Sequence, residues 1–252
     1  MGGLAHYLED EGIATTSICL IRTHTEKIKP PRALAVPFEL GRPLGVPNEP
    51  AFQRRVVRAC LELLERPGGP VLEDFPDSPP GADEPAEGWA CPVNFAPPVD
   101  TSSDAEVIHQ ALLQEINLLR PWYEEAVKNY KRSAFGISGR KPEEIARFLA
   151  DFVVDPEATK SPYPELPELP LGVGFKRVAD DLRYFYTEAA IARPDARTSD
   201  LEVANWLFGE TTLGAVLIAI RDYAMECDEP SLKMMAPVGM VPTHQRHRTQ
   251  HG

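Results

Sequence analysis

The segments EGIATTSICLIR (residues 11–22) and PPRALAVPFELGRPLG (residues 30–45) decide the predicted fold. Each contains a short run rich in β-branched or apolar residues, at 13–21 and at 33–38, which is typical of a buried strand. Leu4, Ala5 and Leu8 precede them at helical spacing, and Gly12 stands where a glycine ends a helix. Helix, glycine and strand in this order form the second half of a β-α-β unit. The sequence therefore predicts an α/β fold with a partial parallel-sheet, Rossmann-like layer at the N-terminus.

The rest of the chain is predicted to be helical. Residues 22–31 form a polar connection and 39–48 a loop, and the next helix has one apolar face made of Val56, Val57, Cys60, Leu61 and Leu64. Residues 71–102 are dense in proline and acid, which is typical of a linker, with Phe75 and Trp89 as anchors. We expect four parts: an α/β layer (1–70), this linker (71–102), an all-helical segment (103–229) and a flexible tail (230–252).

Capping boxes and glycines mark the helices of that segment. Ser103 to Glu106 and Ser199 to Glu202 both have the capping-box spacing. Pro121 is expected to kink or restart the first helix. Gly209 and Gly214 lie inside the longest apolar helix, where they indicate a close helix–helix approach or a break.

Composition restricts the function classes. The net charge is −12 with six histidines counted neutral, and a protein without a basic face is a poor match for nucleic acid. No apolar run approaches the roughly 18–20 residues that span a bilayer. No secretory signal is visible, and none of the four cysteines has a CxxC or CxxxC partner. We therefore expect reduced thiols and a cytoplasmic protein with neither nucleic acid nor membrane as partner.

The loop that follows the second predicted strand is the main candidate binding site. Ligands of open α/β sheets bind where strands end at their carboxyl edge. Gly41 and Gly45 allow positive φ or close backbone approach, and Arg42 between them suits a carboxylate. The alternative is a tight turn with Arg42 paired to Glu39.

Other polar groups give weaker signals. His24 and Glu26 lie near a strand end, where they form either a proton-transfer pair at a substrate site or a solvated loop. The acids at 73, 74 and 77 have no spacing that specifies a cation, and the histidines at 244 and 247 lie in the expected flexible tail. We expect no metal site. Cys91 is either a packed thiol or a proline-flanked redox thiol.

Residues 3–64, about a quarter of the chain, resemble the C-terminal part of the glycine/betaine/sarcosine/D-proline reductase selenoprotein B family. The pairing of EGIATTSICLIR with PPRALAVPFELGRPLG carries the resemblance. The helical part is similar to an extension found in one branch of these proteins, which are labelled reductases without a demonstrated reaction.

The resemblance implies an oxidoreductase that cleaves a C–N bond of an amino acid or related small carboxylate. In the family a selenolate attacks the α-carbon and displaces the amine. The selenocysteine, or a cysteine in its place, lies two residues before a second cysteine, and this motif would fall just before Met1. The resemblance thus implies no catalytic residue and no bound cofactor here, and a truncated product inactive alone. The substrate contacts that we expect, Arg42, Gly41, Gly45 and His24, come from their positions near the strand ends.

Two classes of function remain open. The first is the reductase, with a small-molecule substrate and a homo-oligomer or reductase-complex partner, because an incomplete α/β layer exposes apolar surface. The second is a non-enzymatic helical interaction module with a vestigial α/β fragment. A cysteine hydrolase would need a Cys–His pair, which the sequence does not place.

If Met1 is a start assigned downstream of a selenocysteine codon, peptides encoded upstream of Met1 should be detectable by mass spectrometry, with an in-frame UGA in the gene. A ribosome-binding site at Met1 together with an upstream stop that cannot be decoded would contradict this expectation.

Overall fold

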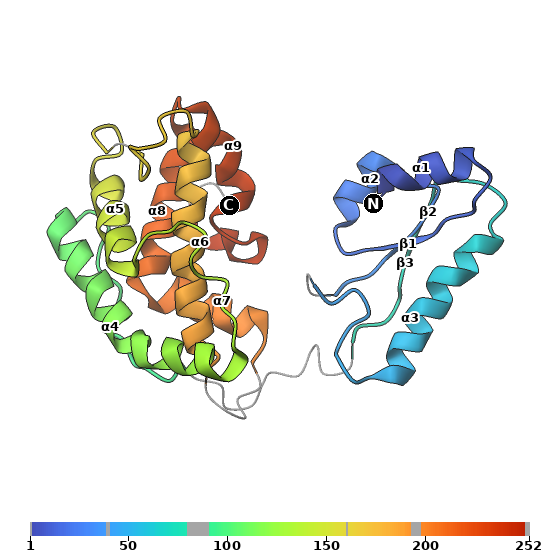
Figure 1. The fold of residues 1–252 in the computed structure, drawn as a ribbon, viewed down its shortest axis with the longest axis horizontal. Coiled ribbons are helices and arrows are strands. Elements are labelled where there is room, and N and C mark those ends of the chain that lie inside the picture. Colours follow the sequence, from blue (N-terminus) through green and yellow to red (C-terminus); the bar gives the residue numbers. More distant parts are fainter. Residues whose placement is uncertain (1, 39–40, 80–90, 160, 193–197, 250–252) are drawn as a thin grey trace. The chain divides into compact units, whose positions relative to one another are not determined.

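The computed structural model describes residues 2–38, 41–79, 91–159, 161–192 and 198–249. The chain divides into two compact units, residues 1–85 and 86–252 (Figure 1). Each unit is described by itself below.

The first unit contains a three-stranded parallel sheet in the order β1-β2-β3. The strands are β1 (Ser17–Cys19), β2 (Arg32–Ala35) and β3 (Val71–Asp74). In register, Ala33 is the partner of both Ser17 and Leu72. The parallel sheet predicted from the sequence is confirmed, although β1 is much shorter than the predicted run at 13–21.

Helices connect the strands. Helix α1 (Gly2–Asp10) precedes β1, α2 (Arg22–Ile28) links β1 to β2, and α3 (Pro50–Glu62) with a 3₁₀ turn (Leu63–Glu65) links β2 to β3. Figure 1 shows α3 on the side of the strands away from α1 and α2. Residues 22–31, expected only to be a polar connection, contain the helix α2, whose one buried residue is Thr25 and whose C-cap Lys29 has the left-handed conformation.

The core of this unit lies between α3 and the sheet. Three aromatic rings meet there, Phe38, Phe52 and Phe75, with centroids 5.6–5.9 Å apart. Their spacing suits tilted and edge-to-face contacts. Phe75 is thus an anchor, as predicted, but it belongs to the α/β core; Trp89, the other expected anchor, lies outside the described residues.

The predicted apolar face of α3 is wrong. Val56 and Cys60 face the core, whereas Val57, Leu61 and Leu64 are exposed. Adjacent residues point about 100° apart on a helix, so Val56 and Val57 cannot both face the sheet fully. The helix carries apolar residues on two sides.

The buried Arg32 ties four segments of the unit together. Its Nη1 lies 2.7 Å from Glu9 Oε1 on α1, and its Nε and Nη2 donate to the carbonyl of Arg66 at 3.2 and 2.9 Å. Glu9 also accepts hydrogen bonds from the N–H and hydroxyl of Thr15, at 2.5 and 3.0 Å, just ahead of β1. The Thr15 N–H, together with Arg32, lowers the pKa of Glu9.

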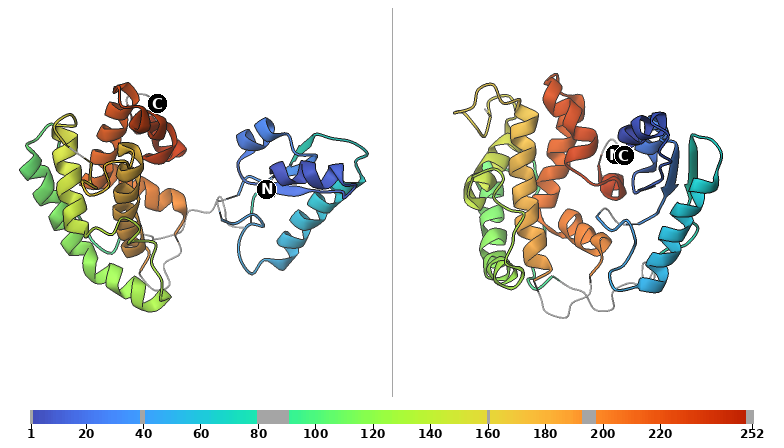
Figure 2. Two further views of the ribbon diagram at one scale, coloured as in Figure 1. Left: turned by 45° about the horizontal axis from the view of Figure 1, so that its top comes forward. Right: turned by 45° about the vertical axis from the view of Figure 1, so that its right-hand side comes forward.

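The second unit is helical. Its helices are α4 (Ala105–Tyr130), α5 (Pro142–Val154), α6 (Leu171–Ala190), α7 (Asp200–Glu210), α8 (Thr212–Glu226) and α9 (Pro230–Gly239), followed by a 3₁₀ segment (Thr243–Arg248). Helix α4 packs on α5 and α6, and α8 contacts α4, α5 and α9 (Figures 1 and 2). Aromatic and aliphatic side chains, including Phe152, Phe175 and Tyr186, fill the core with under 2% exposure.

The helix boundaries confirm some sequence signals and correct others. The capping box at Ser199 and Glu202 is present, whereas Asp104, not Ser103, occupies the N-cap of α4 and makes no side-chain cap bond. Pro121 lies inside α4, which remains one helix and bends in Figure 1. Pro121 explains this bend, because proline has no N–H to donate within the helix and its ring clashes with the preceding turn.

The break predicted around Gly209 and Gly214 is present between α7 and α8, which meet at 83°. The Thr211 hydroxyl donates to Leu207 O at 2.7 Å and accepts from Gly214 N at 2.9 Å. A Cβ on Gly214 would lie 2.0 Å from Leu207 O, so only glycine fits this corner. Among the described helices no single one has the length and hydropathy to cross a bilayer; only this bent pair has them jointly.

Three of the expected domain boundaries are wrong. Residues 71–74 are the third strand, not linker, and Val93 and Phe95 pack on the helical core. The expected flexible tail contains α9, with Leu232 and Met240 buried. An acidic four-residue strand has no alternating apolar pattern, which is why the sequence did not predict β3.

Gly214→Ala should lower the free energy of unfolding of the helical unit by about 2–3 kcal/mol, because backbone atoms must move to admit the methyl group. Denaturant unfolding, monitored by tryptophan fluorescence, measures the stability of this unit, because Trp89, Trp122 and Trp206 all belong to it. Gly209→Ala is the matched control, because its Cβ would meet only the mobile end of Arg248. Equal effects of the two substitutions would contradict the prediction.

Candidate functional site

The carboxyl ends of the three strands lie at one edge of the sheet, because all three run parallel. Cys19, Ala35 and Asp74 are the last residues of β1, β2 and β3. This edge is where ligands bind in open α/β sheets. The sequence predicts that the loop with Gly41 and Gly45 lies at this edge.

An ion pair at this edge joins the start of α2, which follows β1, to the end of β3. Arg22, at the start of α2, donates from Nε to Asp74 Oδ1 at 2.8 Å and from Nη2 to Asp74 Oδ2 at 3.2 Å. It also pairs with Glu26 on the same helix. The hydrogen bond from Arg22 lowers the pKa of Asp74, and Asp74 in turn raises that of Arg22. The edge therefore carries a fixed guanidinium that two carboxylates compensate.

The sequence did not predict this pair. The acids at 73, 74 and 77, whose spacing specifies no cation, each pair with a different arginine. Glu73 accepts from Arg66 at 2.8 Å, and Asp77 from Arg55 at 2.6 Å. The signal that could have predicted the pair is that Arg22 and Asp74 each lie at or just after a strand end. That signal was hidden because the sequence did not predict β3, which ends at Asp74.

The loop after β2 forms a tight turn. Gly45 N–H donates to Arg42 O at 2.9 Å, and Gly41 and Gly45 have φ of 90° and 82°. A Cβ on Gly45 would lie 2.8 Å from Phe52 Cε1. Glycine is therefore required at position 45 both for its backbone conformation and for space. Arg42 is exposed in this turn, and Glu39, its suggested partner, lies outside the described residues.

His24 lies exposed on α2, and the expected proton-transfer pair with Glu26 is not formed in the structure. Residues two apart on a helix point to different sides, and Glu26 instead contacts Arg22. His24 thus remains near the carboxyl edge without an observed acid–base partner among the described side chains.

The four cysteines are all free thiols. Cys19 ends β1 and is half-buried, whereas Cys60 lies in the α/β core. Burial raises the pKa of Cys91 to about 11, so this thiol stays protonated at neutral pH. That value opposes a redox role for Cys91 and favours the packed thiol, because the thiolate is the reactive form.

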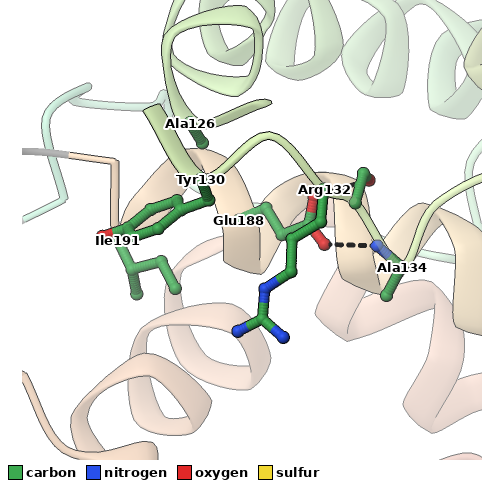
Figure 3. Close-up of a pocket in the computed structure, with 7 residues that line it drawn as sticks. Ala126, Tyr130, Arg132, Ala134, Glu188 and Ile191 are labelled. Carbon is green, nitrogen blue, oxygen red and sulfur yellow. Dashed lines mark hydrogen bonds between the residues drawn. The ribbon is translucent and has the colours of Figure 1, made fainter. Parts of the chain in front are cut away.

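The helical unit contains a separate cavity of about 380 Å³, where α4 ends beside α6 (Figure 3). Tyr130, Ala126 and Ile191 supply apolar walls, and Arg132 and Glu188 supply charge. Figure 3 shows the Arg132 guanidinium directed away from the Glu188 carboxylate, and no ion pair joins the two. A guanidinium beside apolar walls suits a small carboxylate.

Two carboxylates of α6 hold the wall of this cavity in place. Glu188 accepts from Ala134 N and Ser133 Oγ, both at 2.7 Å. The fully buried Asp181 accepts from the N–H groups of residues 136–138 at 2.8–3.1 Å and from Ser138 Oγ at 2.5 Å. The loop that carries Arg132 is therefore fixed on α6.

Another buried carboxylate, Glu115, has a structural role. It accepts from Thr212 N at 2.6 Å and Leu213 N at 3.4 Å at the start of α8, and from the Tyr186 hydroxyl at 2.9 Å. Burial raises the pKa of Glu115, and the hydrogen bonds from Thr212, Tyr186 and Leu213 oppose that shift. Burial and the neighbouring Glu115 also raise the pKa of Tyr186. All the contacts of Glu115 are internal, so it joins α4, α6 and α8.

Comparison with protein-family models, curated proteins and solved structures finds no match to this chain. The part of the chain that the structure describes contains no group of three or more potential metal ligands. His244 and His247 lie in the 3₁₀ segment Thr243–Arg248, where His247 Nδ1 lies 3.1 Å from the carbonyl of His244.

As the pH rises above 4.5, the ordinary pKa of glutamate, the helical unit of the Glu115→Gln variant should lose less stability than that of the wild type. A raised pKa means that the folded state holds a proton which the unfolded chain has released. Between the pKa of Glu115 in the unfolded chain and its higher pKa in the folded protein, the free energy of unfolding of the wild type therefore falls by up to about 1.4 kcal/mol per pH unit. A glutamine at this position contributes no such loss.

Denaturant unfolding at pH 4 to 7.5, with Glu124→Gln as the exposed control on the same helix, checks this prediction. The free energy of unfolding of the Glu115→Gln variant, relative to wild type, should increase with pH. A constant difference across the range would refute the assignment.

Proposed function

We propose that the α/β unit is part of a Rossmann-like layer in a reductase of the selenoprotein B type, and that its carboxyl edge binds a small carboxylate such as an amino acid. The observation that carries the proposal is the Gly41–Gly45 turn. This turn is the part of the connection between the central strand β2 and α3 in which Arg42 is exposed. Ligands of open α/β sheets bind beyond the carboxyl ends of the strands, which supports a site here.

The chemistry at the edge supports a carboxylate ligand. Arg42 is the exposed guanidinium of the turn, and its planar group can donate two parallel hydrogen bonds to a carboxylate. We assign the recognition of the carboxylate to Arg42 because it lies in the turn that follows the central strand, with Gly41 and Gly45 shaping the turn and His24 on α2.

The proposal gives the residues of this chain binding and orienting roles only. In the family, a selenocysteine or cysteine motif supplies the nucleophile for reductive C–N cleavage, and the proposal assigns that role to no residue of this chain. The thiols within the chain are poor substitutes, because Cys60 is buried in the core and Cys91 has a pKa of about 11. Cys19 has no second cysteine at redox spacing.

The proposal is tested by titrating the full chain with glycine, sarcosine, glycine betaine and D-proline by calorimetry. Arg42→Ala should weaken binding of the preferred ligand about 10- to 100-fold, the usual effect of removing a charge-assisted hydrogen bond, with unchanged circular dichroism. Arg132→Ala, which alters the cavity in the helical unit, should leave that affinity unchanged.

The control separates three outcomes. Loss of binding in Arg132→Ala alone would move the carboxylate site to the helical unit and overturn the assignment to the sheet edge. Absence of binding by any of the four compounds, or equal binding by wild type and Arg42→Ala, would favour a non-enzymatic interaction module.

A further inference from the structure

The outward side of α3 carries an apolar row. Val57 and Leu61 on α3 are 39% and 53% exposed, and Leu64 in the 3₁₀ turn that continues the helix is 37% exposed. The opposite side of α3 is buried in the core. The spacing of the three exposed residues, four and then three positions, aligns them along one stripe of the helix. Single exposed apolar residues are ordinary, but an aligned row of three indicates a contact surface.

Val57 and Leu61 of this row line a groove of about 590 Å³ along the helix. Leu44 and Pro50 extend its apolar wall beyond the row at the N-terminal end of α3. The charged members of the lining are Arg54, Arg58, Glu62 and Glu65. The surface is therefore an apolar stripe with charged borders.

The charges on this surface are separated by sign along the helix axis. Arg54 and Arg58 lie toward the N-terminal end, and Glu62 and Glu65 lie toward the C-terminal end. None of these four makes an ion pair with a described residue, whereas the neighbouring Arg55 pairs with Asp77. The unpaired charges of this helix are thus concentrated on the side with the apolar row.

We propose that this surface, the outward face of α3, binds the same face of a second copy of the chain, with the two helices antiparallel about a twofold axis. Antiparallel pairing places the positive end of each helix on the negative end of its partner. Val57 of each copy then faces the row of the other near Leu61, and Arg54 approaches Glu65. A twofold interface must be self-complementary, and this charge order meets that condition.

Other arrangements fit the same surface less well. Parallel pairing would place Arg54 against Arg54 and Glu65 against Glu65, which like-charge repulsion disfavours. A strongly acidic or strongly basic partner would match one half of the surface and be repelled by the other. A partner of mixed charge, including the helical unit of the same chain, is a rival occupant that the experiment must distinguish.

The size of the surface predicts a weak dimer. Thirteen residues of α-helix extend about 20 Å, so each copy contributes less than the roughly 800 Å² per partner of a standard stable interface. We expect dissociation in the micromolar range or weaker, and further weakening by salt, because the pairing charges are exposed.

Sedimentation velocity of the full chain over a concentration series tests the proposal. Arg54→Glu and Glu65→Arg should each weaken dimerisation about tenfold or more, since each places like charges opposite each other. The double variant Arg54→Glu with Glu65→Arg restores opposite charges in an antiparallel dimer, and its dissociation constant should return to within about threefold of wild type.

A second pair of variants tests the apolar row. Leu61→Asp should abolish the dimer, and Leu118→Asp, at an equally exposed leucine on α4, should leave it intact. Circular dichroism and the unfolding midpoint of each variant show whether the fold is retained.

The proposal is overturned if the wild type is monomeric up to about 1 mM, the upper limit of a weak specific dimer. It is also overturned if Leu118→Asp disrupts a dimer that Leu61→Asp preserves, or if the double charge variant is no better than the single ones. A monomer in which Leu61→Asp makes α3 newly accessible to protease would assign the surface to the chain's own helical unit instead.

Discussion

Arg32 is the point at which the α/β unit is held together. Its guanidinium is nearly buried and contacts α1 through Glu9 and the end of the 3₁₀ turn through the carbonyl of Arg66. A buried guanidinium is tolerable only when its donors are satisfied, so the positions of α1 and of the chain before β3 are coupled to β2. The turn after β2, which carries the candidate site, starts from this same strand.

This constraint explains how so small a sheet can present an ordered edge. Three strands of three or four residues bury little apolar surface by themselves. The Phe38, Phe52 and Phe75 cluster lies beyond the strand ends, on the same side as the Gly41–Gly45 turn, and supports it through Gly45. Polar contacts around Arg32 thus fix one end of the sheet, and aromatic packing fixes the other.

The sequence predicted the elements whose pattern is local. β-branched residues around Ile18 indicated β1, the Ser199–Glu202 spacing indicated the start of α7, and the glycines indicated the corner before α8. It did not predict β3, because Val71–Asp74 gains its strand conformation from pairing with β2. The sequence also predicted a flexible tail after residue 229, whereas the structure has α9 there. The local sequence of α9 indicates a helix only weakly, and burial of Leu232 and Met240 stabilises it.

The candidate site was predictable only in part, for the same reason. Gly41 and Gly45 are needed for the backbone of their own turn, and such a requirement is visible in sequence. The pairing of Arg22 with Asp74 joins residues 52 positions apart, and a charge pair of that separation depends on the complete sheet. Arg132 was missed because its cavity is created by the end of a different helix.

The two carboxylates of α6 that hold the loop after α4 have a consequence for how this protein can vary. Asp181 and Glu188 are seven residues apart, close to two full turns, so they emerge from the same side of α6. Insertion or deletion of one residue between them would rotate one carboxylate by about 100° and detach half of the loop. This stretch of α6 therefore cannot change in length without releasing one of the two anchors of the loop.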